Sequence, residues 1–202
     1  MNYFTGSLPQ NICQGGLLRK FTASHNQFSG QIPKSLRNCS ALLRLQLKGN
    51  KLSWNLSEDF GAYPRLNFID LSHNNFFGEI SSNWASCPKL NMPLIAYNII
   101  GTIPAIIGNS TQLGVLDLSW NRLVGEIPRQ LGKLTSLFKL LLNGNQLFGI
   151  IPQELGAFTS FSFWTCLPTC LASQYRDVWV ISHNLFTWTW VTISSIKIFL
   201  IS

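Results

Sequence analysis

The stretch "LGVLDLSWNRLVGEIPRQL", residues 113–131, decides the fold of this chain. It fits the template LxxLxLxxNxLxGxIPxxL, in which apolar residues alternate as in a strand and Asn, Gly and Ile-Pro follow at fixed distances. Five further segments fit the same template, with the leading Leu at positions 18, 42, 66, 90 and 137. The step is 24 residues, apart from one step of 23. A period of this length predicts a solenoid of stacked turns.

Each part of the template has a physical role. Alternate side chains of LxxLxL point into the core from a short strand. The Asn is expected to turn inward, where its amide satisfies backbone groups at a bend. The Gly allows a backbone conformation that a side chain would oppose, and Ile-Pro directs an extended segment into a short helical turn. The predicted Asn row is Asn26, Asn50, Asn74, Asn98, Asn121 and Asn145.

The repeat predicts both the fold class and the organisation of the chain. We expect an α/β-type repeat protein: a right-handed leucine-rich-repeat solenoid with a parallel β-sheet on one face and short 3-10 or extended segments on the other. One turn buries too little apolar surface to fold alone, so stacking must stabilise it. Residues 1–16 form a truncated repeat, residues 17–160 six repeats, and residues 161–202 an irregular tail without the repeat.

The N-x-L-x-G-x-I-P signature resembles the plant-specific class of leucine-rich repeat, found in ectodomains of receptor-like kinases, receptor-like proteins and polygalacturonase inhibitors. The segments "NLSEDFGAYP", "IDLSHNNFFGEISSNW" and "GKLTSLFKLLLNGNQLFG" are similar to the subfamily of MDIS1-interacting receptor-like kinase 2. This resemblance implies a fragment of a receptor-like kinase ectodomain that recognises a peptide or protein ligand and a co-receptor ectodomain in cell-surface signalling. It places the parent protein, a glycoprotein, at the extracellular face of the plasma membrane.

The same resemblance implies that a signal peptide, a transmembrane helix and a kinase domain belong to the parent protein. The start "MNYFTGSLPQ" has no basic residues followed by an apolar run, so we expect no signal peptide in this chain. The location of the fragment itself is left open. The alternatives are a secreted protein of the polygalacturonase-inhibitor type and a truncated gene product without function.

Composition and motifs exclude several classes of protein. With 46% hydrophobic and 11% charged residues, the chain is not of the disordered type. Its net charge of +7 comes from positive residues scattered singly, so we expect no nucleic-acid binding. Asp59-Phe60-Gly61 resembles the magnesium-binding triplet of kinases, but no other kinase motif accompanies it. The three His residues lack metal or catalytic spacing, and we expect no enzyme, no metal and no cofactor.

The outward strand positions and the bends beside the Asn row predict the binding surface. On a solenoid, the sheet face is an extended and rigid surface, and aromatic and Arg side chains are typical anchors there. The alternative is a solvated sheet with scattered aromatic residues. The candidate ligand-binding residues are Lys20, His25, Arg44, Phe68, Asp70, His73, Met92, Tyr97 and Trp120.

Five Cys residues, odd in number and scattered, argue against a disulfide framework that covers the whole chain. Cys39 and Cys87 share one repeat slot two turns apart, about 9–10 Å, which is too far for a disulfide. We therefore expect both to be buried thiols. Three Asn-x-Ser/Thr triplets, at Asn38, Asn55 and Asn109, are glycosylation acceptors if the chain enters the secretory pathway.

Three departures from the template concern the stability of the stack. Trp54 stands where Gly is expected, and Pro93 occupies a strand slot, where it removes a ladder donor. In the same turn, the step from Asn98 to the next Gly is one residue short. We expect the turn of residues 89–112 to be the weakest of the stack.

The tail from residue 161 breaks the pattern. Cys166 and Cys170 lack a second pair of metal ligands, and residues 178–202 are too polar for a membrane span. Reading the codons one base upstream can convert residues 163–176 into LDLSTNLFSKSIP and residues 186–200 into YLDLGNNKFNQDIPY, two more repeats in phase. Our hypothesis is that the tail is a frameshifted translation of further repeats.

Overall fold

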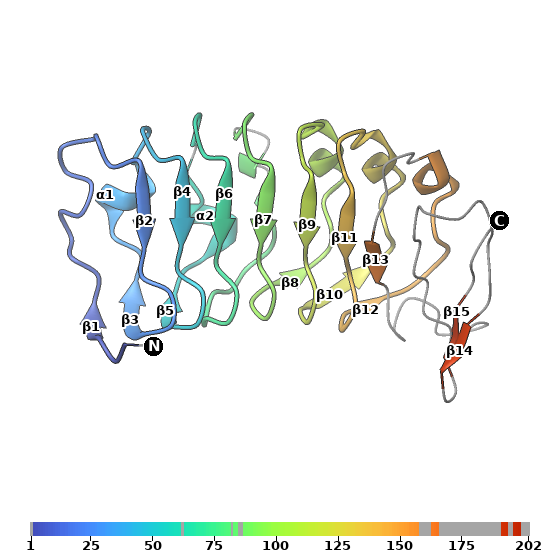
Figure 1. Ribbon diagram of the computed structural model, residues 1–202, viewed down its shortest axis with the longest axis horizontal. Coiled ribbons are helices and arrows are strands. Elements are labelled where there is room, and N and C mark those ends of the chain that lie inside the picture. The colour runs from blue at the N-terminus through green and yellow to red at the C-terminus, as the bar shows by residue number, and fades with distance from the viewer. Residues whose placement is uncertain are drawn as a thin grey trace.

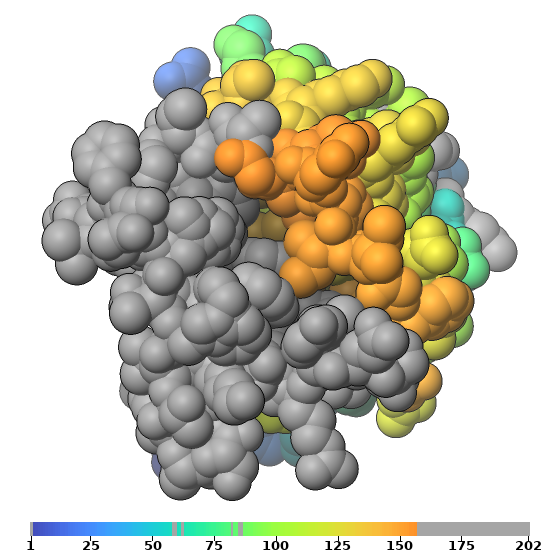
Figure 2. Space-filling view, turned by 90° about the vertical axis from the view of Figure 1, so that its right-hand side faces the viewer, coloured from blue at the N-terminus to red at the C-terminus, as the bar shows by residue number. Residues whose placement is uncertain are grey.

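The computed structural model describes residues 2–157 apart from 62, 82, 85 and 86, together with the strands at 163–165, 191–193 and 196–198. The turns stack side by side along the long axis of an extended solenoid, with their strands running across it (Figure 1). Viewed along that axis, the described turns lie one behind another (Figure 2). The predicted repeat solenoid is thereby confirmed. We number turns 1 to 6 by their leading residues Leu18, Leu42, Leu66, Leu90, Leu113 and Leu137.

A seven-stranded parallel sheet runs through all six turns. Each strand is only three residues long, and successive strands pair in the register that the repeat period sets: Lys20 lies opposite Arg44, and Arg44 opposite Phe68. The strands, in spatial order, are β2 (Lys20–Thr22), β4 (Arg44–Gln46), β6 (Phe68–Asp70), β7 (Met92–Leu94), β9 (Val115–Asp117), β11 (Lys139–Leu141) and β13 (Phe163–Thr165).

A second, lateral sheet borders the core; it lies below the seven-stranded sheet in the view of Figure 1 and is split into two parts. One part contains β1 (Thr5–Ser7), β3 (Gln27–Gln31) and β5 (Lys51–Ser53), and the other β8 (Ile100–Gly101), β10 (Arg122–Gly125) and β12 (Gln146–Leu147). Between them, turn 3 contributes one isolated bridge, from Asn55 to Phe77. Gly30, Gly78, Gly125 and Gly149 have φ between 79° and 92°, which explains why the template requires Gly there.

Short helical segments follow the Ile-Pro pairs, as the template predicts. The carbonyls of Pro33, Pro104 and Pro128 each accept a hydrogen bond from the N–H three residues later, which starts the turn. The segments that follow Ile-Pro are α1 (Lys34–Arg37), η2 (Ala105–Asn109), η3 (Arg129–Lys133) and η4 (Gln153–Ala157). In turn 2, α2 (Leu56–Asp59) follows Asn55 instead, whose side chain accepts a hydrogen bond from the N–H of Ser57.

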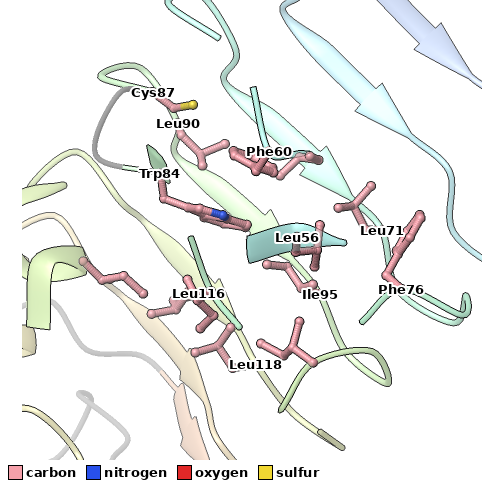
Figure 3. Close-up of a cluster of buried hydrophobic side chains, with 14 of the residues drawn as sticks. Leu56, Phe60, Leu71, Phe76, Trp84, Cys87, Leu90, Ile95, Leu116 and Leu118 are labelled. Carbon is pink, nitrogen blue, oxygen red and sulfur yellow. The ribbon is translucent and has the colours of Figure 1, made fainter. Parts of the chain in front are cut away.

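The core consists of stacked Leu and Ile side chains, with an aromatic cluster in turns 2 and 3 (Figure 3). Trp54, which replaces the expected Gly, is 2% exposed and packs against Phe60 and Phe76. Phe60 also stacks on Trp84, with ring centroids 4.6 Å apart. The Asp-Phe-Gly triplet is therefore part of a packing motif, since its Phe60 is a core residue.

The structure corrects the prediction for Cys39. Cys39 forms a disulfide with Cys13, with a Cα–Cα distance of 5.9 Å, and is not a free thiol. Cys13 lies outside the Cys39 repeat slot, in the loop that follows β1, so comparison of equivalent slots did not reveal the pair. Cys87 is a buried free thiol as expected, and burial raises its pKa.

Turn 4 departs from the regular pattern where the sequence does. Between β7 and β9 the register holds a single pair, Leu94 with Asp117, next to Pro93, which has no N–H to donate. The side-chain oxygen of Asn98 accepts no hydrogen bond in the described part of the chain. These contacts describe the geometry of turn 4 and do not measure its stability, so its lower stability stays a prediction.

The described part of the tail consists of three strands. β13 pairs in parallel with β11, and Trp164 lies opposite Leu140, in the phase of the repeat. β14 (Val191–Ile193) pairs antiparallel with β15 (Ile196–Ile198). The rest of the frameshift hypothesis lies outside the described residues, and the hypothesis stays a prediction.

Candidate functional site

The candidate site is the sheet face, the solvent side of the seven-stranded sheet. Its central row is formed by register partners: Lys20, Arg44, Phe68 and Met92 lie opposite one another on β2, β4, β6 and β7. Lys20 and Arg44 are exposed, and Met92 is half-buried. Because these strands are fixed by the core, the row presents its side chains on a rigid support.

Two predicted binding residues are less available than expected. Phe68 is 9% exposed, because the guanidinium of Arg44 lies over its ring, 4.6 Å from the centroid. Asp70 is 7% exposed, and its carboxylate accepts a hydrogen bond from the N–H of Ser72 at 3.1 Å. Phe68 thus supports Arg44, and Asp70 closes a bend.

The Asn row forms a chain of hydrogen bonds along the edge of the sheet. Asn74 is representative: its Nδ2 donates to the carbonyls of Leu47 and Leu71, at 2.9 and 3.1 Å, and its Oδ1 accepts from the N–H of Leu52. Leu47 and Leu52 belong to the preceding turn. Each such Asn therefore closes its own bend and attaches it to the turn before.

The residue before each Asn occupies what we call the bend slot. The bend slot holds His25, Gly49, His73, Tyr97, Trp120 and Gly144. All six have φ between 53° and 70°, the left-handed region that opposes side chains other than Gly. This backbone shape directs the slot outward, beside the sheet face.

Three bend-slot rings form the aromatic stack, His73, Tyr97 and Trp120. The centroids of His73 and Tyr97 are 4.2 Å apart, and those of Tyr97 and Trp120 are 5.9 Å apart with planes within 8° of parallel. Tyr97 is 45% and Trp120 54% exposed. Successive turns thus hold these rings in one continuous, partly exposed column.

The glycines of the bend slot give the neighbouring rings room. A Cβ placed on Gly144 would lie 2.8 Å from the Trp120 indole, and one on Gly49 would lie 3.0 Å from Nδ1 of His25. The indole and the imidazole therefore lie over a glycine of the following turn. His25 is separated from the aromatic stack by Gly49, so the structure places it apart from His73.

Phe138, which directly precedes β11, was not among the predicted binding residues. It is 40% exposed, and a Cβ on Gly114 would lie 2.9 Å from its ring. The sequence did contain a signal for this ring, because the equivalent position of the preceding turn is Gly114. Gly144 gives the corresponding signal for Trp120, from the following turn. A glycine beside a large side chain indicates where a ring crosses the neighbouring turn.

The three glycosylation triplets have different surroundings. Asn38 and Asn109 are exposed at the ends of α1 and η2. Asn55 is half-buried in the bridge to turn 3, and its side chain accepts a hydrogen bond from the N–H of Ser57 at 3.0 Å. Only the first two present a free side chain to solvent in the folded chain.

The part of the chain that the structure describes bears on metal ligation and on membrane crossing. There, no group of three or more His, Cys, Asp or Glu side chains is arranged to hold a metal ion. No helix among the described residues has the length and apolarity to cross a membrane.

Comparison with known proteins identifies the repeat. The Leucine Rich Repeat family matches residues 17–39, 65–87 and 112–134. No curated protein sequence matches the chain. The chain therefore carries leucine-rich repeats, and the solenoid is their fold.

Solved structures similar to this chain are ectodomains of plant receptor kinases. That of GASSHO1/SCHENGEN3 from Arabidopsis thaliana, in complex with CASPARIAN STRIP INTEGRITY FACTOR 2, is 33% identical, with a TM-score of 0.76 over 83% of this chain. That of the Arabidopsis receptor kinase HAESA with an N-terminally extended IDA peptide hormone is 36% identical, with a TM-score of 0.76 over 80% of the chain. The structure of HAESA in complex with IDA and the co-receptor SERK1 is 30% identical in sequence, with a TM-score of 0.73 over 87% of this chain.

The chain spans 21% of the GASSHO1 chain and 27% and 33% of the two HAESA chains. The match therefore concerns a short run of repeats. What those receptors bind is a property of the whole ectodomains.

Proposed function

We propose that the sheet face and the aromatic stack bind a peptide or protein ligand, as part of a plant receptor-like kinase ectodomain. One observation carries the proposal: Tyr97 and Trp120 remain about half exposed although the backbone must adopt a left-handed conformation to hold them there. Stacking between the rings does no more than offset the strain of the left-handed backbone, so the rings add little to the stability of a solvated surface, and Gly fits the same slot with less strain, as Gly49 and Gly144 show. Binding supplies a reason for them.

The similar structures support the ligand class. GASSHO1 and HAESA are described in complex with peptides, and one HAESA complex contains a co-receptor. By analogy, this chain would contribute part of a surface for a peptide and a co-receptor ectodomain. The finer proposal, a subfamily like that of MDIS1-interacting receptor-like kinase 2, rests on the amino-acid sequences of turns 2, 3 and 6.

The disulfide and the two exposed acceptor triplets support an extracellular site of action. Disulfides such as Cys13–Cys39 form and persist in oxidising compartments. Asn38 and Asn109 lie at the ends of helical segments, away from the sheet face, so glycans there would leave the face open. We therefore place the parent protein at the outer face of the plasma membrane.

Peptide selection from a library tests the function. The full chain, purified with its disulfide intact, is presented with random peptides displayed on phage, and dissociation constants of the selected peptides are measured. Trp120→Ala should weaken binding by about 2 kcal/mol, or roughly thirtyfold. Phe148→Ala is the matched control, since Phe148 is 51% exposed but follows β12 on the lateral side.

Two results would contradict the proposal. One is that the chain is correctly folded but selects no peptide from the library. The other is an equal loss of affinity in Trp120→Ala and Phe148→Ala, which would show that the sheet face has no special part.

A further inference from the structure

The net charge of the chain is confined to its first 57 residues. That segment contains seven of the fifteen Lys and Arg residues and none of the eight Asp and Glu residues, which accounts for the whole formal charge of +7. The other eight Lys and Arg residues are balanced by eight Asp and Glu residues in positions 58–202. The first two turns are therefore cationic, and the rest of the chain is neutral overall.

Four of these seven charges belong to the sheet face or to the ends of its strands. We call Arg19, Lys20, Arg44 and Lys48 the cationic patch. Lys20 and Arg44 are register partners on β2 and β4, Arg19 precedes β2, and Lys48 lies in the bend after β4. Arg19, Lys20 and Arg44 are exposed, and within the described residues none of the four forms an ion pair.

The patch is unfavourable for the isolated chain. Like charges directly opposite on neighbouring strands repel each other and destabilise the pair. Their fields add over a distance of about 10 Å at ordinary ionic strength, which makes the surface attractive to anions. The neighbouring Thr22 and Gln46 cannot offset this repulsion, because both are neutral and they form a hydrogen bond with each other. An anionic partner would offset it.

The character of the sheet face changes between β4 and β6. From β6 onward the row continues with Phe68 and Met92, and the aromatic stack lies beside it. The strands β6, β7 and β9 contain no Lys or Arg, and the carboxylates of Asp70 and Asp117, which accept hydrogen bonds from the N–H groups of their own bends, give this part of the face a negative charge. The Arg44 guanidinium over the Phe68 ring marks the boundary.

We infer that the sheet face binds an extended peptide in one direction, with Asp or Glu side chains over β2 and β4 and apolar or aromatic side chains over β6 to β9. This inference rests on the proposed function and adds the chemistry and the orientation of the ligand. Four strand spacings of about 4.8 Å give roughly 19 Å, which about six extended residues span.

A uniformly anionic partner fits the face less well than such a peptide. An acidic polysaccharide or a nucleic acid carries charge along its whole length and would bring uncompensated charge onto the aromatic half. A peptide can carry its acidic residues at one end only. The division of the face thus favours a peptide over either polyanion.

The test uses the folded full chain and a library of random peptides of about ten residues displayed on phage, selected at low salt. We expect selected peptides to carry a cluster of Asp or Glu at one end and apolar residues at the other. Synthetic copies should bind at least about tenfold more weakly to Arg44→Glu. Raising the salt concentration should also weaken their binding to the wild-type chain.

The matched control is Lys34→Glu. Lys34 is exposed in α1, on the far side of the core from the sheet face, and the substitution changes the net charge by the same amount. Its peptide affinity should stay within about twofold of the wild type. Lys20→Glu is a second patch variant for the case that Arg44→Glu disturbs Phe68, and near-ultraviolet circular dichroism checks the fold of each variant.

The possible results are distinguishable. Selected peptides without an acidic cluster, or an equal effect of Arg44→Glu and Lys34→Glu, would overturn the inference and leave peptide binding intact. Binding of oligogalacturonides instead of peptides, lost in Arg44→Glu, would overturn it in favour of a polysaccharide. If a folded chain selects nothing, both this inference and the proposed function fail. A photoreactive group at the acidic end should crosslink to turns 1 and 2, and crosslinking to turns 4 and 5 would refute the orientation.

Discussion

The Asn row and the bend slot lie next to each other in every turn, yet their residues differ in how strictly they are fixed. All six turns keep Asn, and four of the six are at most 9% exposed. The bend slot contains His, Gly, Tyr and Trp in the same six turns, all with left-handed backbone. A buried amide must satisfy several backbone groups at once, which only one residue type does. An exposed bend constrains the backbone alone, so its side chain is free to serve binding.

The largest effect is expected from Asn74→Ala. The substitution removes one acceptor and the donors to Leu47 and Leu71 from a buried bend, leaving backbone groups without partners. We expect a loss of about 3 kcal/mol in the free energy of unfolding, measured by urea denaturation. Asn75→Ala, at an exposed neighbour, should stay within about 0.5 kcal/mol of the wild type. Equal losses in the two variants would contradict a structural role for the row.

Asn98→Ala should be less costly, at about 1.5 kcal/mol. Its Nδ2 donates to the carbonyls of Leu71 and Ala96, but its Oδ1 accepts no hydrogen bond in the described structure. The same urea titration compares it with Asn74→Ala. A loss as large as that of Asn74→Ala would show that turn 4 is as tightly held as turn 3.

In the bend slot, Gly144→Ala should cost about 1 kcal/mol. At φ of 70° a side chain is strained, and the new methyl group would approach the Trp120 indole. Gly156→Ala is the control, because no atom lies within 4 Å of a Cβ there. If thermal unfolding shows no difference between the two variants, the bend slot does not require its backbone shape.

The smallest effect is expected from Tyr97→Gly, within about 0.5 kcal/mol of the wild type, because lost stacking is offset by relief of the left-handed backbone. Tyr97→Ala loses the same ring without that relief and should be about 1 kcal/mol less stable than Tyr97→Gly. Urea denaturation of the pair thus measures the backbone strain directly. Identical stabilities would mean that Tyr97 is not strained.

The regular part of the fold could be predicted from the sequence because the period fixes the register. Once Leu18 and Leu42 are equivalent, the pairing of Lys20 with Arg44 follows. The contact between Arg44 and Phe68 could not be predicted, because a repeat template places Cα atoms and not the ends of long side chains. Cys13 was missed for a related reason: its loop departs from the template, so no slot described its position.

The candidate site was predictable in outline only. The outward columns were identified, and three of their bend-slot residues form the aromatic stack. That Asp70 would be used to close its bend depends on a local hydrogen bond to Ser72, which outward position alone does not reveal. The left-handed slot had a usable signal, since Gly49 and Gly144 occur where the other turns have rings.

The split in the lateral sheet lies in the same turns in which the sheet face changes from cationic to apolar residues. Between β5 and β8 the single bridge from Asn55 to Phe77 replaces a pair of strands, and here the cationic turns 1 and 2 end. Backbone hydrogen bonds from Asn75 to Leu52 and from Phe77 to Trp54 still cross this place, and the rings of Phe60 and Trp84 stack across it in the core. Turns 2 and 3 are therefore held together although their lateral strands are interrupted. The charge of a ligand and its apolar side chains would meet different turns of one continuous core, so exposed residues for the one can change without altering those for the other.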